Sequence, residues 1–258
     1  MGVCIMDDIT VVEYSERDLS NSLLVVAFPT VGLISSIAGR FIIDSLKLEE
    51  IGAILSKEFM PVTIIHNGKP SPPVRIYAGE KKCGPGGRCE QVAVIISEFM
   101  PPYTIIKPLA DKILEWSQEK GVQAIVSLEG THALNSKEEM RVYGVASNNE
   151  MKKLLKKYNV SDTKEGMITG VNGVLLYQGA LLKKDVICLL SEAQASYPDS
   201  RAAANLLKKI DIMLPEIKID PEPLYKEAEE IEKKIRQFMK QSKPTAPSLP
   251  PIPTEMYR

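Results

Sequence analysis

Short apolar runs alternate with longer stretches of mixed polarity along the first 214 residues of the chain. The runs are rich in valine, isoleucine and leucine, which is typical of strands that are buried on both faces. The mixed stretches place apolar side chains three and four positions apart, as amphipathic helices do. The pattern predicts strands over 9–14, 23–28, 51–55, 91–97, 124–128, 142–146 and 186–190, two short β-like runs within 62–79, and helices over 33–46, 105–120, 150–157, 174–182 and 201–212.

This alternation of continuous apolar strands with amphipathic helices predicts the fold class. Strands that are apolar on both faces need helices on both sides of their sheet. We therefore expect residues 1–214 to form an α/β core domain, with a mostly parallel sheet sandwiched between helices.

The composition changes after residue 214. Residues 215–242 are highly charged, yet an apolar residue recurs at steps of four and three positions, which predicts a helix with a narrow apolar stripe. Such a helix packs either on its own domain or against a neighbouring subunit, and the sequence leaves both open. In the second case, the stripe is an oligomer interface made of Leu224, Ala228, Ile231, Ile235 and Phe238.

The last 16 residues, 243–258, form a proline-rich tail. Five prolines lie between residues 243 and 255, a density that excludes a helix or a central strand. We expect the tail to be extended, partly polyproline II, and exposed. A semi-rigid spacer of this kind presents the terminal residues Met256, Tyr257 and Arg258 at a distance from the core.

Charge and composition narrow the choice of partners. The formal net charge of −1 and the aromatic fraction of 6% favour neither a nucleic acid nor an anionic membrane as a partner. The first 13 residues lack the pattern of a secretory signal, and the apolar runs are too short to span a bilayer. We expect a cytoplasmic protein with no membrane partner.

Two places could carry small-molecule chemistry. The turn at Gly32 follows a strand and precedes a helix, where anions can bind, but it matches neither a dinucleotide fingerprint nor a P-loop, and a tight turn also explains it. Glu129 and His132 follow a predicted strand, at the edge of a sheet where ligands bind in α/β proteins. They could form an acid–base pair, although a glutamate and a histidine meet in loops by chance, and no G-x-S-x-G elbow is present.

The cysteines and carboxylates predict no cofactor and no metal site. Cys83 and Cys89 are separated by five residues, which does not match the spacing of a zinc knuckle. They are either two incidental thiols in a glycine-rich turn or a local disulfide. The carboxylates cluster on predicted helices, where a solvated face explains them.

Five segments, in this order along the chain, resemble the proteasome assembly chaperone 2 family in its archaeal form. The resemblance implies an α/β sandwich distantly similar to nucleoside phosphorylases, no established catalysis, self-association and, in some members, binding to the proteasome α-subunit ring. The segments are Val26-Ala-Phe-Pro-Thr-Val-Gly-Leu33, Ser127-Leu-Glu-Gly-Thr-His132, Tyr143-Gly-Val-Ala-Ser147, Gly166-Met-Ile-Thr-Gly-Val-Asn-Gly173, and Glu192 followed by Tyr197-Pro-Asp-Ser-Arg-Ala-Ala203.

The terminal residues are a separate signal. Met256, Tyr257 and Arg258 resemble the hydrophobic-tyrosine-any tails of proteasomal ATPases and activators, which insert between α subunits. The sequence therefore favours a non-enzymatic proteasome-binding factor that forms a homo-oligomer, a tetramer or a pentamer. The alternative is an α/β enzyme that binds a nucleoside or phosphate through the Gly32 turn with Glu129 and His132.

Overall fold

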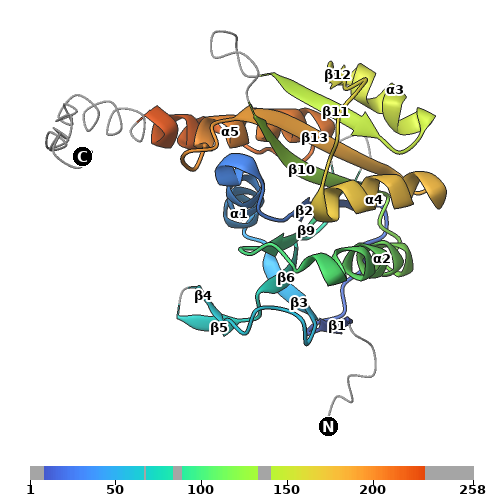
Figure 1. Ribbon diagram of the computed structural model, residues 1–258, viewed down its shortest axis with the longest axis vertical. Helices are drawn as coiled ribbons and strands as arrows, with labels where there is room; N and C mark the ends of the chain where they lie inside the picture. Colours follow the sequence, from blue (N-terminus) through green and yellow to red (C-terminus); the bar gives the residue numbers. More distant parts are fainter. Residues whose placement is uncertain (1–8, 67, 84–88, 133–140, 230–258) are drawn as a thin grey trace, which may run out of the picture.

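A computed structural model describes residues 9–66, 68–83, 89–132 and 141–229 of the chain. Helices cover both faces of one central sheet, and the described C-terminal residues lie on the side of α5 (Figure 1). The elements are β1 (Thr10–Glu13), β2 (Leu23–Ala27), η1 (Val31–Leu33), α1 (Ile34–Leu46), β3 (Glu49–Leu55), β4 (Ile64–His66), β5 (Lys69–Ser71), β6 (Val74–Ala78), β7 (Lys82–Cys83), β8 (Cys89–Glu90), β9 (Val92–Ser97), α2 (Tyr103–Glu119), β10 (Ala124–His132), β11 (Val142–Ala146), α3 (Asn149–Lys157), β12 (Ser161–Asp162), α4 (Gly170–Leu181), β13 (Val186–Ala193) and α5 (Ser200–Met213).

Within the described residues, nine strands form one sheet in the order β1-β3-β6-β9-β2-β10-β13-β11-β12. The four central strands, β9, β2, β10 and β13, run parallel to one another. The strands on either side of them, β6, β3, β1 and β11, pair antiparallel. The predicted α/β sandwich is confirmed, and its parallel part is the middle of a mixed sheet.

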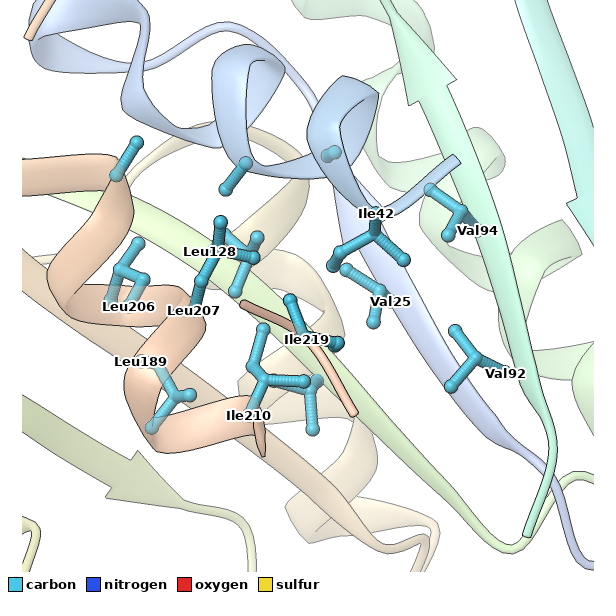
Figure 2. Close-up of a cluster of buried hydrophobic side chains, with 14 of the residues drawn as sticks. Val25, Ile42, Val92, Val94, Leu128, Leu189, Leu206, Leu207, Ile210 and Ile219 are labelled. Carbon is cyan, nitrogen blue, oxygen red and sulfur yellow. The ribbon is translucent and has the colours of Figure 1, made fainter. Parts of the chain in front are cut away.

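Alternate residues of the central strands enter two separate cores. On one face, α1 and α5 pack over residues such as Val25, Val94, Leu128 and Leu189 (Figure 2). On the other face, α2 and α4 pack over the residues between them, such as Val26 and Ile95. Burial on both faces is why these strands are continuously apolar in the sequence.

Two predicted elements differ from the structure at the ends that matter for the site. Strand β10 continues to His132, because its pairing with β13 extends as far as Ala193. Helix α4 begins at Gly170, four residues before the predicted start. The segment 62–79 contains three short strands, β4, β5 and β6, where the sequence predicts two.

The segment after α5 packs on the core. Residues 222–229 are helical, and Leu224 and Ala228 are each 5% exposed within the chain's own fold. Leu224 joins Ile217 and Ile219 in the core beside α5. The first part of the apolar stripe is thus used inside the domain, which is the first of the two alternatives that the sequence leaves open. Ile231, Ile235 and Phe238 lie outside the described residues, and their oligomer role stays a prediction.

The cysteine pair lies in a small hairpin. Strands β7 and β8 place Cys83 opposite Cys89, and Cys83 is disulfide-bonded. Cys188 is a free, buried thiol in β13. Cys83 is therefore not an incidental thiol.

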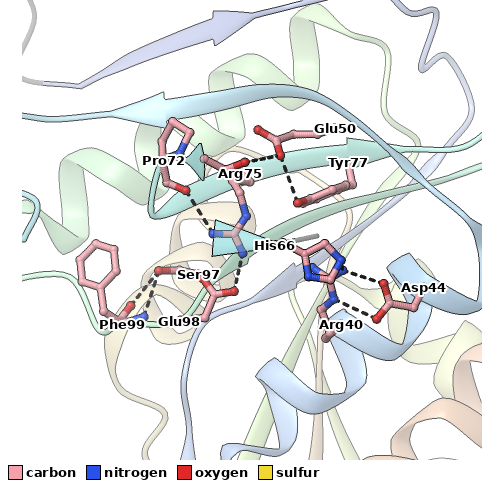
Figure 3. A network of polar contacts seen from close by, with 11 residues as sticks. Arg40, Asp44, Glu50, His66, Pro72, Arg75, Tyr77, Ser97, Glu98 and Phe99 are labelled. Atoms are coloured by element: carbon pink, nitrogen blue, oxygen red, sulfur yellow. Dashed lines mark hydrogen bonds and ion pairs between the residues drawn. The ribbon is translucent and has the colours of Figure 1, made fainter. Parts of the chain in front are cut away.

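A buried arginine links strand β6 to the segments that precede it and that follow β9 (Figure 3). Arg75 of β6 is 1% exposed. Its guanidinium donates to the carbonyl oxygen of Pro72 at 3.1 Å and to the carboxylate of Glu98. Burial acts to lower the pKa of Arg75, but the Glu98 carboxylate and Tyr77 together raise it.

Changing Glu98 to alanine is expected to lower the free energy of unfolding by about 2 kcal/mol, because Arg75 would keep a buried charge without its carboxylate. The loss is moderate because Glu98 is itself 39% exposed. Urea unfolding measures it, and a second change, Arg75→Met, should restore part of the stability.

A matched control exists at Glu58. This residue opens a second Glu-Phe-Met-Pro segment, as Glu98 does, but its side chain is exposed. Glu58→Ala should change stability by less than about 0.5 kcal/mol. An equal loss at both positions would contradict the role assigned to the Arg75–Glu98 pair.

Candidate functional site

The three residues of the predicted docking motif, Met256, Tyr257 and Arg258, lie outside the described residues, as does the whole proline-rich tail. The small-molecule alternative, by contrast, falls entirely on described residues.

The Gly32 turn is filled by the protein itself. Gly32 adopts a φ of 64°, and its carbonyl oxygen accepts a hydrogen bond from the amide of Asp199 at 2.8 Å. A Cβ at this position would lie 2.9 Å from the carbonyl oxygen of Gln194. The glycine is needed for a turn that packs tightly between the end of β13 and the start of α5.

Glu129 lies near the carboxyl end of β10 and faces helix α4. The side-chain nitrogen of Asn172 donates to Glu129 Oε2 at 2.9 Å and to the Leu128 carbonyl oxygen at 2.8 Å. Burial raises the pKa of Glu129 to about 7, although hydrogen bonds from Asn172 and from the Gly130 backbone act in the opposite direction. At neutral pH, the carboxyl group therefore exists in both protonation states.

Glu129 and Asn172 line a cavity of about 290 Å³. Its walls come from the residues after β2, the end of β10, Met100 after β9, and the first turn of α4. The lining residues are Phe28, Pro29, Thr30, Val31, Met100, Glu129, Thr169, Gly170, Val171 and Asn172.

His132 belongs to a different and larger cavity, of about 860 Å³. This cavity lies on the same face of the sheet, beside the later turns of α4, and is lined by residues of β11 and β13. Tyr143, Tyr177, Leu190 and Glu192 are among its walls. Glu192, which is 9% exposed, was not assigned a role from the sequence.

The alternative set is thus only partly one site, because residues 29–31 of the Gly32 turn line the small cavity with Glu129, whereas Gly32 itself and His132 do not. Gly32 contacts Asp199 and Gln194, Glu129 lines the small cavity, and His132 lines the large one. An acid–base pair needs its members within hydrogen-bond reach of one substrate. The structure does not bring these residues together in that way.

The described residues hold neither a membrane-spanning helix nor a metal-binding cluster. No helix in the described part of the chain is long and apolar enough to cross a membrane. Across 9–66, 68–83, 89–132 and 141–229, no group of three or more histidine, cysteine, aspartate or glutamate side chains is placed to hold a metal ion.

Comparison with known proteins places this arrangement in a family. A model of the PAC2 family matches residues 24–239. The chain belongs to the PAC2 family. The match confirms the resemblance noted in the sequence and runs past α5 into the charged segment. An uncharacterized protein of Methanocaldococcus jannaschii is 33% identical over 236 residues, which cover 92% of this chain and 93% of the relative.

Solved structures with the PAC2 fold include two from Pyrococcus furiosus. PbaA, described as an archaeal homolog of proteasome-assembly chaperone, is 29% identical with a TM-score of 0.80, covering 91% of this chain and 93% of its own. PbaB, described as an archaeal proteasome activator, is 23% identical with a TM-score of 0.79, covering 91% and 100%. At that identity, PbaB shows the shared fold alone.

Sequence reasoning missed the partner of Glu129. Asn172 is 43 positions away from Glu129 along the chain, and the sequence gives it only as one member of a family segment. Gly170 and Gly173 lie on either side of Asn172 in the sequence. Glycine is a poor helix former, so the sequence does not predict that Asn172 belongs to a helix. Only information that β10 and α4 lie side by side could have predicted that Glu129 and Asn172 interact.

Proposed function

We propose that this PAC2-family chain is a non-enzymatic proteasome-binding factor, an assembly chaperone or a gate-opening activator. The observation that carries the proposal is the family match over residues 24–239. The likeness to PbaA, a homolog of proteasome-assembly chaperone, supports the same class. Such a factor acts in the cytoplasm, where its partner is made.

The docking element of the proposal is the C-terminal motif. The terminal carboxylate of Arg258 can pair with a lysine in a pocket between α subunits, which is a charge-assisted contact. Tyr257 offers a rigid ring with a polar tip, a side chain typical of binding hot spots. Met256 adds an adaptable apolar contact, and the prolines before it hold the motif away from the core.

Binding to a ring also favours self-association of this chain. A single short tail makes a weak contact, and several tails on one oligomer raise the effective concentration of each. The remaining residues of the stripe, Ile231, Ile235 and Phe238, are the candidates for contacts between copies. We therefore expect a tetramer or a pentamer.

Deleting Met256, Tyr257 and Arg258 is expected to abolish capture of purified core proteasome by the full-length chain. Tyr257→Ala should weaken binding by about 2 kcal/mol or more per engaged tail, because it removes an aromatic anchor. One residue added after Arg258 should be nearly as harmful, since it displaces the carboxylate. Pull-down and peptide hydrolysis by the core proteasome measure these effects.

Two changes serve as controls for that experiment. Arg258→Ala should matter little, because the motif requires a terminus and not an arginine, and Pro250→Ala should matter less still. A chain that ends at Gln241 and still binds and stimulates the proteasome as the full chain does would refute docking through the tail.

The oligomeric state is tested by light scattering at micromolar concentration. The expected mass is four or five times that of the 28.5 kDa chain. A triple change of Ile231, Ile235 and Phe238 to serine should lower the mass. The monomer mass for the unchanged protein would remove the argument from multiple tails.

A further inference from the structure

The cavity beside Glu129 and Asn172 is lined by the Glu129 carboxyl group and by the uncapped first turn of helix α4. We propose that this cavity is a binding site for a small neutral amide or lactam. The proposal stands independently of proteasome binding, because it uses only residues of β2, β10 and α4.

The place of the cavity in the sheet favours ligand binding. Strand β2 lies between β9 and β10, and all three run parallel. After β2, the chain builds one side of the sheet up to β9 and then crosses to the other side with β10. A crevice forms at the carboxyl ends of strands where the order reverses in this way, and α/β proteins bind ligands there.

The cavity offers hydrogen-bond acceptors. The Leu128 carbonyl oxygen can only accept, so it fixes the nitrogen of the Asn172 amide toward β10. The other end of that amide, Oδ1, is buried without a donor among the described residues, and Asn172 as a whole is 2% exposed. Beside it, Glu129 presents a carboxyl group with one oxygen held by Asn172. Asn172 thus orients the Glu129 carboxyl group, which is partly exposed and is the acceptor that an N–H group of a ligand in the cavity can reach.

The cavity also offers hydrogen-bond donors. The first backbone N–H groups of a helix have no partner within it, and the N-cap residue of α4, Thr169, makes no side-chain capping bond. Gly170, Val171 and Asn172, which form that first turn, all line the cavity. A carbonyl oxygen of the ligand can accept from these amides.

The charges of the cavity favour a neutral ligand. The described residues that line it include no lysine, arginine or histidine. An anion would therefore meet the Glu129 carboxyl without a compensating cation, and a cation would meet the positive end of the α4 dipole. An amide places a carbonyl oxygen and an N–H group side by side, and so matches both kinds of partner while carrying no charge.

Size and apolar surface complete the description of the ligand. Pro29, Val31, Met100 and Val171 give the walls an apolar part. A volume of about 290 Å³ is at the lower end for small-molecule sites and suits a single ring with one amide group. Nicotinamide has this form and is the probe for the test.

Nicotinamide is titrated into the full-length protein by calorimetry, and the methyl resonance of Met100, at the wall of the cavity, is followed by NMR. We expect saturable binding with a shift of the Met100 methyl signal. Glu129→Gln should weaken the affinity at least about tenfold, because the new amide turns its N–H₂ toward the N–H of the ligand. The matched change Glu192→Gln, in the larger cavity, should leave the affinity within about twofold.

Changes in the probe test the same contacts without altering the protein. N,N-dimethylnicotinamide has no N–H group and should bind at least about tenfold more weakly. Nicotinate and inorganic phosphate, which are anions, should not compete. Tighter binding of either anion, no binding of nicotinamide at about 10 mM, or unchanged affinity in Glu129→Gln would overturn the proposal.

The dependence on pH gives an independent check. An ionised carboxylate is the stronger acceptor, so nicotinamide should bind about threefold or more tightly at pH 8 than at pH 6. The neighbouring titratable group is Cys188 of β13, whose pKa burial raises to about 12, so it stays neutral over this range. An affinity that falls as the pH rises would instead indicate an anion bound to the protonated acid, and would overturn the proposal.

Discussion

Changing Gly130 to alanine is expected to lower the free energy of unfolding by about 3 kcal/mol or more, one of the largest losses available to a single methyl group in this fold. Gly130 lies in β10 under the turn that follows β2. A Cβ at this position would lie 2.2 Å from the carbonyl oxygen of Val31 and 3.0 Å from its carbonyl carbon. The three nearest atoms all belong to the Val31 backbone, so no flexible side chain can move aside.

We expect Gly130→Ala to distort the small cavity as well as to lower the stability of the core. The amide of Gly130 donates to Thr30 Oγ1 at 3.2 Å, and both Thr30 and Val31 line that cavity. Pushing the turn away from β10 should therefore weaken binding of nicotinamide in whatever fraction remains folded. Urea unfolding followed by circular dichroism measures the loss of stability.

Gly68→Ala is the matched control for Gly130→Ala. Gly68 lies in the turn between β4 and β5, and a Cβ there would meet nothing within 4 Å. Its φ of +75° makes alanine cost only about 1 kcal/mol. If both changes lower the free energy of unfolding equally, the close packing of the turn on β10 does not explain why position 130 is a glycine.

The architecture of the sheet could be predicted because its cause is visible in the sequence. Strands buried on both faces are continuously apolar, as Val25 and Val26 of β2 show by entering opposite cores. Helices α1, α2 and α5 begin and end within a few residues of their predicted bounds, since their apolar stripes face one layer only. The antiparallel strands β3 and β6 beside the centre also carry buried apolar runs, so composition does not reveal their direction.

The candidate site could be predicted only in part, for a physical reason. The end of β10 is polar and carries Gly130, and it is a strand because it pairs with β13 up to Ala193. The start of α4 carries Gly170 and Gly173, which are poor helix formers, and tertiary packing overrides that propensity. Glu129 was found from its position after an apolar strand. Asn172 and the cavity they share depend on contacts between distant segments, which periodicity does not report.

Changing Glu129 to glutamine is expected to stabilise the protein at pH 8 by about 2–3 kcal/mol, with little effect near pH 4.5. Burial raises the pKa of the Glu129 carboxyl from 4.5 to about 7. As the pH rises from 4.5, the unfolded chain releases this proton first, while the folded chain still holds it. Stability therefore falls through the window from pH 4.5 to 7 and is level above it, and glutamine, which has no proton to release, removes that fall.

Urea unfolding of both proteins at pH 4.5, 6 and 8 measures the difference. Glu58→Gln, at an exposed position, corrects for the loss of one carboxyl group and should follow the unchanged protein. Parallel curves for Glu129→Gln and the unchanged chain would contradict the burial of the carboxyl group. A gain in stability at pH 8 would mean that the fold keeps Glu129 at a cost. Such costs are typical of groups retained for binding or chemistry and not for packing, so the same measurement bears on the ligand site at Asn172.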